Sequence, residues 1–156
     1  MAEFNWPLTG GVFLAALVVA GLFLTARSIW RWKKLRRLGA PISYRLYVSL
    51  TWRGVKVPPI AAAHWAAKTL GYEVDLDLWV SFALLRVDVV KVASALAAAD
   101  ACGLGTSAAQ LGAAALAGYD PAEVVQAAHE RNLKEFTAKD LGELNAWGLS
   151  RSDKPV

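Results

Sequence analysis

A repeat at an offset of 32 residues constrains the fold of this chain more than any other feature of its sequence. In this register Trp52, Leu84 and Leu116 coincide, and Gly71 coincides with Gly103. A repeat of this length is one supersecondary unit, which buries its apolar face only by stacking on its neighbours. We therefore predict three stacked units, with the bounds 42–71, 74–103 and 106–135.

The repeat decides between helix and strand. Residues 42–52 and 74–84 alternate apolar with mostly polar side chains, which is a strand pattern. Residues 106–118 lack this alternation and are rich in alanine, which favours a helix. Because equivalent positions in a repeat share one conformation, we predict an all-α, solenoid-like domain over residues 42–149, in which each unit is a helical hairpin. Residues 137–149 then form a partial capping helix.

Turn residues at equivalent positions support this assignment. Asp88 and Asp120 are expected to be the N-caps of second helices, and Glu123 should close a capping box with Asp120. Lys56 stands in place of the aspartate in the first unit. Glycines that favour the left-handed conformation at a helix end follow two of the second helices, at Gly71 and Gly103.

An apolar run of nineteen residues without a charged side chain, Leu8 to Ala26, precedes the repeats. As a helix it would be about 28 Å long, close to the roughly 30 Å of a bilayer's hydrocarbon core. Trp6 lies before it and Trp30 after it, where aromatic rings settle among lipid headgroups. A cleaved signal peptide carries its positive charges before the apolar run, which is the reverse order. We predict a membrane anchor over residues 1–30, and three glycines within the run leave a re-entrant insertion open.

A basic segment, RSIWRWKKLRR, follows at residues 27–37. It holds six of the chain's 17 basic residues and no acidic residue, whereas residues 38–156 hold 11 basic and 12 acidic ones. The excess positive charge therefore reflects one local cluster, which makes nucleic-acid binding a minor alternative. We expect residues 31–41 to form a juxtamembrane linker that attracts anionic lipid headgroups. The predicted membrane-interface residues are Trp6, Arg27, Trp30, Arg31, Trp32, Lys33, Lys34, Arg36 and Arg37.

The position of these charges also predicts an orientation. Because basic residues collect only after the apolar run, the positive-inside rule places the N-terminus outside the cell membrane and the helical domain in the cytoplasm. Residues 150–156 form a polar tail. The single cysteine, Cys102, excludes an intrachain disulfide and suits a reducing compartment. We expect it to be a small buried thiol and not a nucleophile.

Patterns typical of an enzyme or a metal site do not occur in the sequence. His64 and His129 stand alone, without the spacing of zinc ligands. The stretch CGLGTS lacks the lysine of a P-loop and is typical of a helix end followed by a cap. Asp75 and Asp77 fit a solvated helix start better than an acid–base pair. We therefore predict no catalytic residue, no metal and no cofactor.

Large aromatic side chains in the repeats are candidate contacts for a protein partner, because a domain this small has limited room to bury them. Packing in the core is an equally weighted alternative. The candidates are Trp52, Trp65, Trp79, Phe82 and Trp147.

The repeats resemble the bacterial flotillin-like FloA family of membrane-microdomain scaffolds. The resemblance covers about Val48 to Leu133 and rests on VKVPPIAAAHWAAKTLG, VDVVKVASALAAADA and LAGYDPAEVVQAA, after an apolar segment followed by basic residues. It implies a helical, membrane-proximal region, which in the family precedes a band-7 (SPFH) domain and an oligomerising tail. Neither occurs before Val156, so we expect a truncated flotillin-like protein.

The combined expectation is a membrane-anchored helical scaffold or adaptor. It would present a cytoplasmic helical surface to a protein partner or to further copies of itself. The alternative is a non-catalytic accessory subunit of a large membrane enzyme complex.

Overall fold

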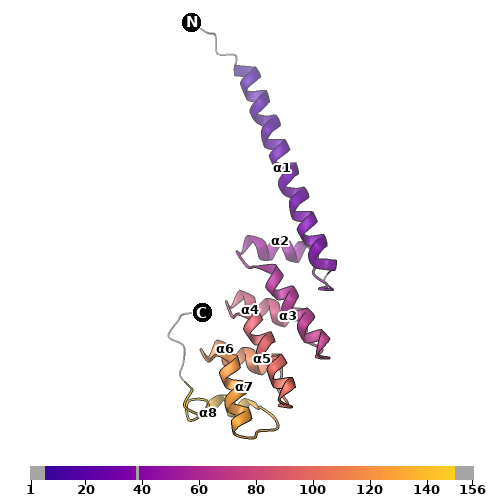
Figure 1. Cartoon of the computed structure of the whole chain (residues 1–156). Coiled ribbons are helices and arrows are strands. Elements are labelled where there is room, and N and C mark those ends of the chain that lie inside the picture. The colour runs from indigo at the N-terminus through magenta and orange to yellow at the C-terminus, as the bar shows by residue number, and fades with distance from the viewer. Residues whose placement is uncertain (1–5, 38, 150–156) are drawn as a thin grey trace.

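The computed structural model describes residues 6–37 and 39–149, with side chains from residue 13 onward. Within these ranges the secondary structure consists of helices and no strands, which confirms the all-α fold (Figure 1). The helices are α1 (Trp6–Arg37), α2 (Tyr44–Trp52), α3 (Val57–Thr69), α4 (Leu76–Leu84), α5 (Val89–Ala101), α6 (Ala108–Leu116), α7 (Pro121–Glu130) and α8 (Ala138–Glu143). Both segments with strand-like alternation are therefore helical, as α2 and α4.

The helix starts recur at the 32-residue offset. In α2, α4 and α6 the N-cap side chain accepts a backbone N–H of the first turn, and these caps are Ser43, Asp75 and Ser107. The N-caps of α3, α5 and α7 are Lys56, Asp88 and Asp120. Short polar side chains stabilise a helix start because they satisfy N–H groups that have no partner within the helix. Lys56 makes no such hydrogen bond.

The capping box predicted between Asp120 and Glu123 does not occur among the described hydrogen bonds. Asp120 accepts the N–H of Ala122, and reciprocal boxes occur instead at the starts of α6 and α8. In α6 the box joins Ser107 to Gln110.

The six helices from α2 to α7 also end alike. The residue after each C-cap has a positive φ, and these residues are Gly54, Gly71, Arg86, Gly103, Gly118 and Asn132. The next residue, aliphatic or aromatic in every case, donates its N–H to the carbonyl five residues earlier. This is the Schellman arrangement, which satisfies the last carbonyls of a helix. The predicted roles of Gly71 and Gly103 are confirmed.

The helices of the body stack in chain order. α3 packs on α5 and α5 on α7, while α4 lies against α3 and α6 against α5. Ile60, Val92 and Val124 occupy equivalent positions on the three second helices, and all three side chains are fully buried. Each hairpin therefore completes the apolar core of the hairpin before it.

α1 extends away from this body, and α2 lies across the end of the body that α1 joins (Figure 1). Among the α1 side chains that the structure describes, those that pack against the body lie in the last turns, where Leu35 is buried and Trp32 is half-buried. The eight large apolar side chains described from Phe13 to Leu24 are each more than half exposed. The segment Phe13–Arg37 is long and apolar enough to be a membrane anchor or a signal sequence.

Candidate membrane-proximal site

The basic residues of the segment 27–37 are all exposed on the last three turns of α1. Two of them lie over indole rings: Lys34 Nζ is 5.9 Å from the Trp30 ring centroid, and the Arg36 guanidinium is 5.5 Å from that of Trp32. Trp30 is exposed, at 66%, and remains a predicted interface residue. The side chain of Trp6 lies outside the described part of the chain.

Trp32 differs from the other predicted interface residues because it joins α1 to the first unit. Its Nε1 donates a hydrogen bond to the carbonyl of Ile42 at 2.9 Å. Its ring meets that of Tyr44 edge to face, with the centroids 5.5 Å apart. The start of α2 is therefore held at the level of Trp32 along α1.

The positive charge extends beyond the basic segment into the first unit. From Phe4 to Tyr72 the chain has ten basic residues and no acidic one, whereas residues 73–156 have seven basic and 12 acidic residues. The additional basic side chains are all exposed: Arg45, Arg53, Lys56 and Lys68. The interpretation of one local cluster is therefore wrong in its extent. Counting charges over residues 38–156 as one block hid this division, which a count for each unit would have revealed.

A cavity of about 650 Å³ lies between α1 and the first unit. Its apolar wall includes Leu35 and Tyr47, which are both buried. Three exposed cations line it: Arg31 and Lys34 from α1, and Lys56 from the turn before α3. None of the residues that line this cavity is acidic.

Residues of α2 and its C-cap line a second, more open groove. Trp52, at the end of this helix, is 89% exposed. The groove residues are Tyr44, Arg45, Val48, Ser49, Trp52 and Arg53. This groove combines aromatic and basic side chains, which is typical of protein segments at a bilayer interface.

The five candidate partner-contact aromatics divide between surface and core. Trp52 and Trp65 are exposed, at 89% and 56%. Trp147 is partly buried against Phe136, with the Arg131 guanidinium 5.0 Å from its ring centroid. Trp79 and Phe82 lie in the core, 0% and 5% exposed, where they pack edge to face. Those two residues are therefore removed from the candidate contact surface.

Sequence reasoning missed two members of an exposed apolar row. Leu84 and Leu116 are 39% and 44% exposed, and they occupy the same repeat position as Trp52. The three residues end α2, α4 and α6, and we call them the apolar row. The repeat register that aligned them was the available signal, because equivalent positions in stacked units lie along one edge.

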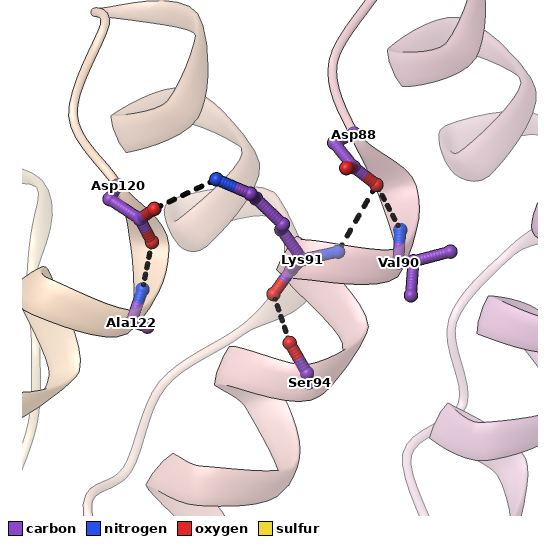
Figure 2. A network of polar contacts seen from close by, with 6 residues as sticks. All are labelled: Asp88, Val90, Lys91, Ser94, Asp120 and Ala122. Atoms are coloured by element: carbon purple, nitrogen blue, oxygen red, sulfur yellow. Dashed lines mark hydrogen bonds and ion pairs between the residues drawn. The ribbon is translucent and has the colours of Figure 1, made fainter. Parts of the chain in front are cut away.

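Lys91 links the second and third units through the N-cap of α7. Its Nζ lies 3.0 Å from the Asp120 carboxylate, which also accepts the N–H of Ala122 (Figure 2). The hydrogen bond from Lys91 lowers the pKa of Asp120, and the same bond raises the pKa of Lys91. Asp88 caps α5 by accepting the N–H groups of Val90 and Lys91.

Neither Cys102 nor His64 lines the cavity beside α1. Cys102 is exposed at the C-cap of α5, so the expectation of a buried thiol is wrong. His64 is half-buried, and its Nδ1 has no hydrogen-bond partner. Among the residues that the structure describes, no three His, Cys, Asp or Glu side chains are grouped so as to hold a metal ion.

No family model, curated protein or solved structure matches the chain.

Proposed function

We propose that this chain is a membrane-anchored helical scaffold or adaptor in a bacterial cell membrane. α1 crosses the bilayer with its N-terminus outside, and the helical body lies at the cytoplasmic surface as a solenoid-like stack of hairpins. The resemblance of residues 48–133 to the flotillin-like family supports this class of protein.

The observation that carries the membrane part is the exposure of α1. The eight large apolar side chains described from Phe13 to Leu24 are not buried against the described body. Moving a Val, Leu or Phe side chain out of water is worth roughly 1.5–3 kcal/mol, so transfer of all eight into lipid is worth on the order of 10 kcal/mol. Alkaline carbonate washing of membranes should leave the chain in the pellet. Release into the supernatant would contradict the spanning helix.

The scaffold part of the proposal rests on the apolar row, Trp52, Leu84 and Leu116. Exposed apolar side chains aligned along one edge of a stacked body suit a contact with another helical protein or with a second copy. We expect Leu84→Glu with Leu116→Glu to abolish capture of protein partners from native membranes. Val90→Glu is the control for an acidic residue added at an exposed apolar position, because Val90 is 50% exposed and lies outside the row. Equal capture by both variants would contradict this contact surface.

The form of the captured complex separates the scaffold from its alternative. After detergent extraction, heterogeneous assemblies favour a scaffold. A complex of fixed stoichiometry with a catalytic partner favours a non-catalytic accessory subunit instead. Binding of nucleic acid with a steep salt dependence would overturn the assignment of the basic segment to lipid headgroups.

A further inference from the structure

We propose that the cavity between α1 and the first unit binds the headgroup of an anionic phospholipid. This inference rests on the proposed insertion of α1 into the bilayer. It goes further than general attraction between a basic segment and a membrane, because it assigns one lipid to a site with named walls.

The cavity lies at the depth of the lipid phosphates. Arg31 is five residues beyond Ala26, where the uncharged run ends, which is about 7.5 Å along the helix axis. The headgroup region extends roughly 5–8 Å beyond the hydrocarbon core on each side. The backbone of Lys34 lies about 4.5 Å farther from the hydrocarbon core than that of Arg31. Its side chain compensates for this distance, because long side chains on a helix point back toward the helix N-terminus. Both cationic groups therefore reach the headgroup layer.

The charge of the cavity is complementary to a phosphodiester. Arg31, Lys34 and Lys56 surround it, and its lining contains no acidic residue. The ion pair present among the described residues joins Lys91 to Asp120 in other units, so these three cations have no carboxylate partner there. A guanidinium offers two parallel N–H groups to phosphate oxygens, and ammonium groups add point charges.

Lys56 is the informative member of the three cations. Its equivalents in the second and third units are Asp88 and Asp120, which cap the helices that follow them. In the first unit the cap position carries the opposite charge and makes no capping hydrogen bond. With lysine in place of aspartate, the start of α3 lacks a capping hydrogen bond. The cavity in turn lacks a carboxylate that would repel a bound anion.

The walls of the cavity suit the part of a lipid that follows the phosphate. Leu35, Tyr47 and Val57 present buried apolar surface beside the cations. A volume of about 650 Å³ lies within the usual range for small-molecule sites. The exposed apolar segment of α1 from Phe13 to Leu24 lies N-terminal to this cavity, toward the proposed bilayer, where acyl chains would lie. An acidic protein segment would match the cations but not this continuity with the anchor.

Two triple variants with the same change in charge test the site. Arg31→Ala/Lys34→Ala/Lys56→Ala removes the cations of the cavity, whereas the control removes three nearby cations that do not line it. The control is Lys33→Ala/Arg36→Ala/Arg37→Ala. Each triple variant also removes one cation that lies over an indole ring, Lys34 over Trp30 or Arg36 over Trp32.

The measurement is native mass spectrometry of the full chain released from nanodiscs of mixed phosphatidylglycerol and phosphatidylcholine. Wild type and control should retain one phosphatidylglycerol. In the cavity variant the fraction of chains that retain this lipid should fall roughly tenfold or more, because each charge-assisted hydrogen bond contributes about a factor of ten in affinity. Equal loss from both triple variants would mean diffuse attraction and would overturn the site. Displacement of the lipid by millimolar inorganic phosphate or glycerophosphate would also overturn it, since the source would then be soluble.

A single variant distinguishes loss of lipid binding from loss of folding. Lys56→Asp restores the cap found at Asp88 and Asp120, so it should raise the melting temperature while it lowers retention of phosphatidylglycerol. Unchanged retention in this variant would contradict the site. If the chain still pellets after carbonate washing, only the headgroup site has failed; release of the wild type would mean that the proposed anchor has failed.

Discussion

Gly112→Ala tests the packing of the body. Gly112 lies within α6, and a Cβ added there would stand 2.0 Å from Cζ of the Phe82 ring. Contact between carbon atoms is favourable at about 3.5–4.0 Å, so the ring would have to move by roughly 1.5 Å. Phe82 is 5% exposed and packs against Trp79, with ring centroids 6.3 Å apart, so little free space is available to it.

Two effects of opposite sign compete in this variant. Alanine is favoured over glycine inside a helix by about 1 kcal/mol. Overpacking of a core costs about 1–3 kcal/mol, and a rigid buried ring places the cost toward the upper end of that range. We therefore expect Gly112→Ala to lower the free energy of unfolding by about 1–2 kcal/mol.

The assay is urea unfolding of the full chain in detergent micelles, followed by circular dichroism at 222 nm. Gly142→Ala is the matched control, because a Cβ at Gly142 in α8 meets nothing within 4 Å, and this variant should be neutral or more stable. In the background of Phe82→Leu, the cost of Gly112→Ala should largely disappear. A Gly112→Ala protein as stable as the wild type would refute the contact, and with it the assignment of Phe82 to the core.

Three further measurements follow from the same contacts. Trp52→Ala should change the free energy of unfolding by less than about 0.5 kcal/mol, whereas Trp79→Ala should lower it by about 3–5 kcal/mol; similar values in urea unfolding would be inconsistent with their 89% and 0% exposure. Arg86→Gly should raise stability by up to about 1 kcal/mol, because Arg86 has a φ of 62° where the other two units have glycine, and a lower melting temperature would argue against this strain. The hydrogen bond from Lys91 lowers the pKa of Asp120, so this bond stabilises the fold above the ordinary carboxyl pKa of 3.8, and the stabilisation is lost as the pH falls below that value. Asp120→Asn should therefore flatten the loss of stability in thermal melts below about pH 4, and an unchanged acid limb would show that this bond is not made.

The sequence by itself determined where the helices of the body begin and end. Caps such as Asp88 and left-handed residues such as Gly103 act through backbone groups within a few positions of themselves, so their effect is visible in one short stretch. The repeat register carried this local information across units and overruled the strand-like alternation of residues 42–52 and 74–84. It also aligned Trp52 with the two leucines of the apolar row.

The tertiary structure decided what each side chain faces. Trp52 in α2 and Trp79 in α4 are the same residue type in equivalent first helices, yet Trp52 is 89% exposed and Trp79 is fully buried. The difference arises because Trp79 lies on the face of α4 that packs against neighbouring helices, whereas Trp52 does not lie on a packed face of α2. The cavity unites Arg31 with Lys56, which are 25 residues apart, through the packing of α1 on the first unit. Capping is a property of neighbours along the chain, but burial and the grouping of charges depend on which surfaces pack together, and that is set by contacts between distant segments.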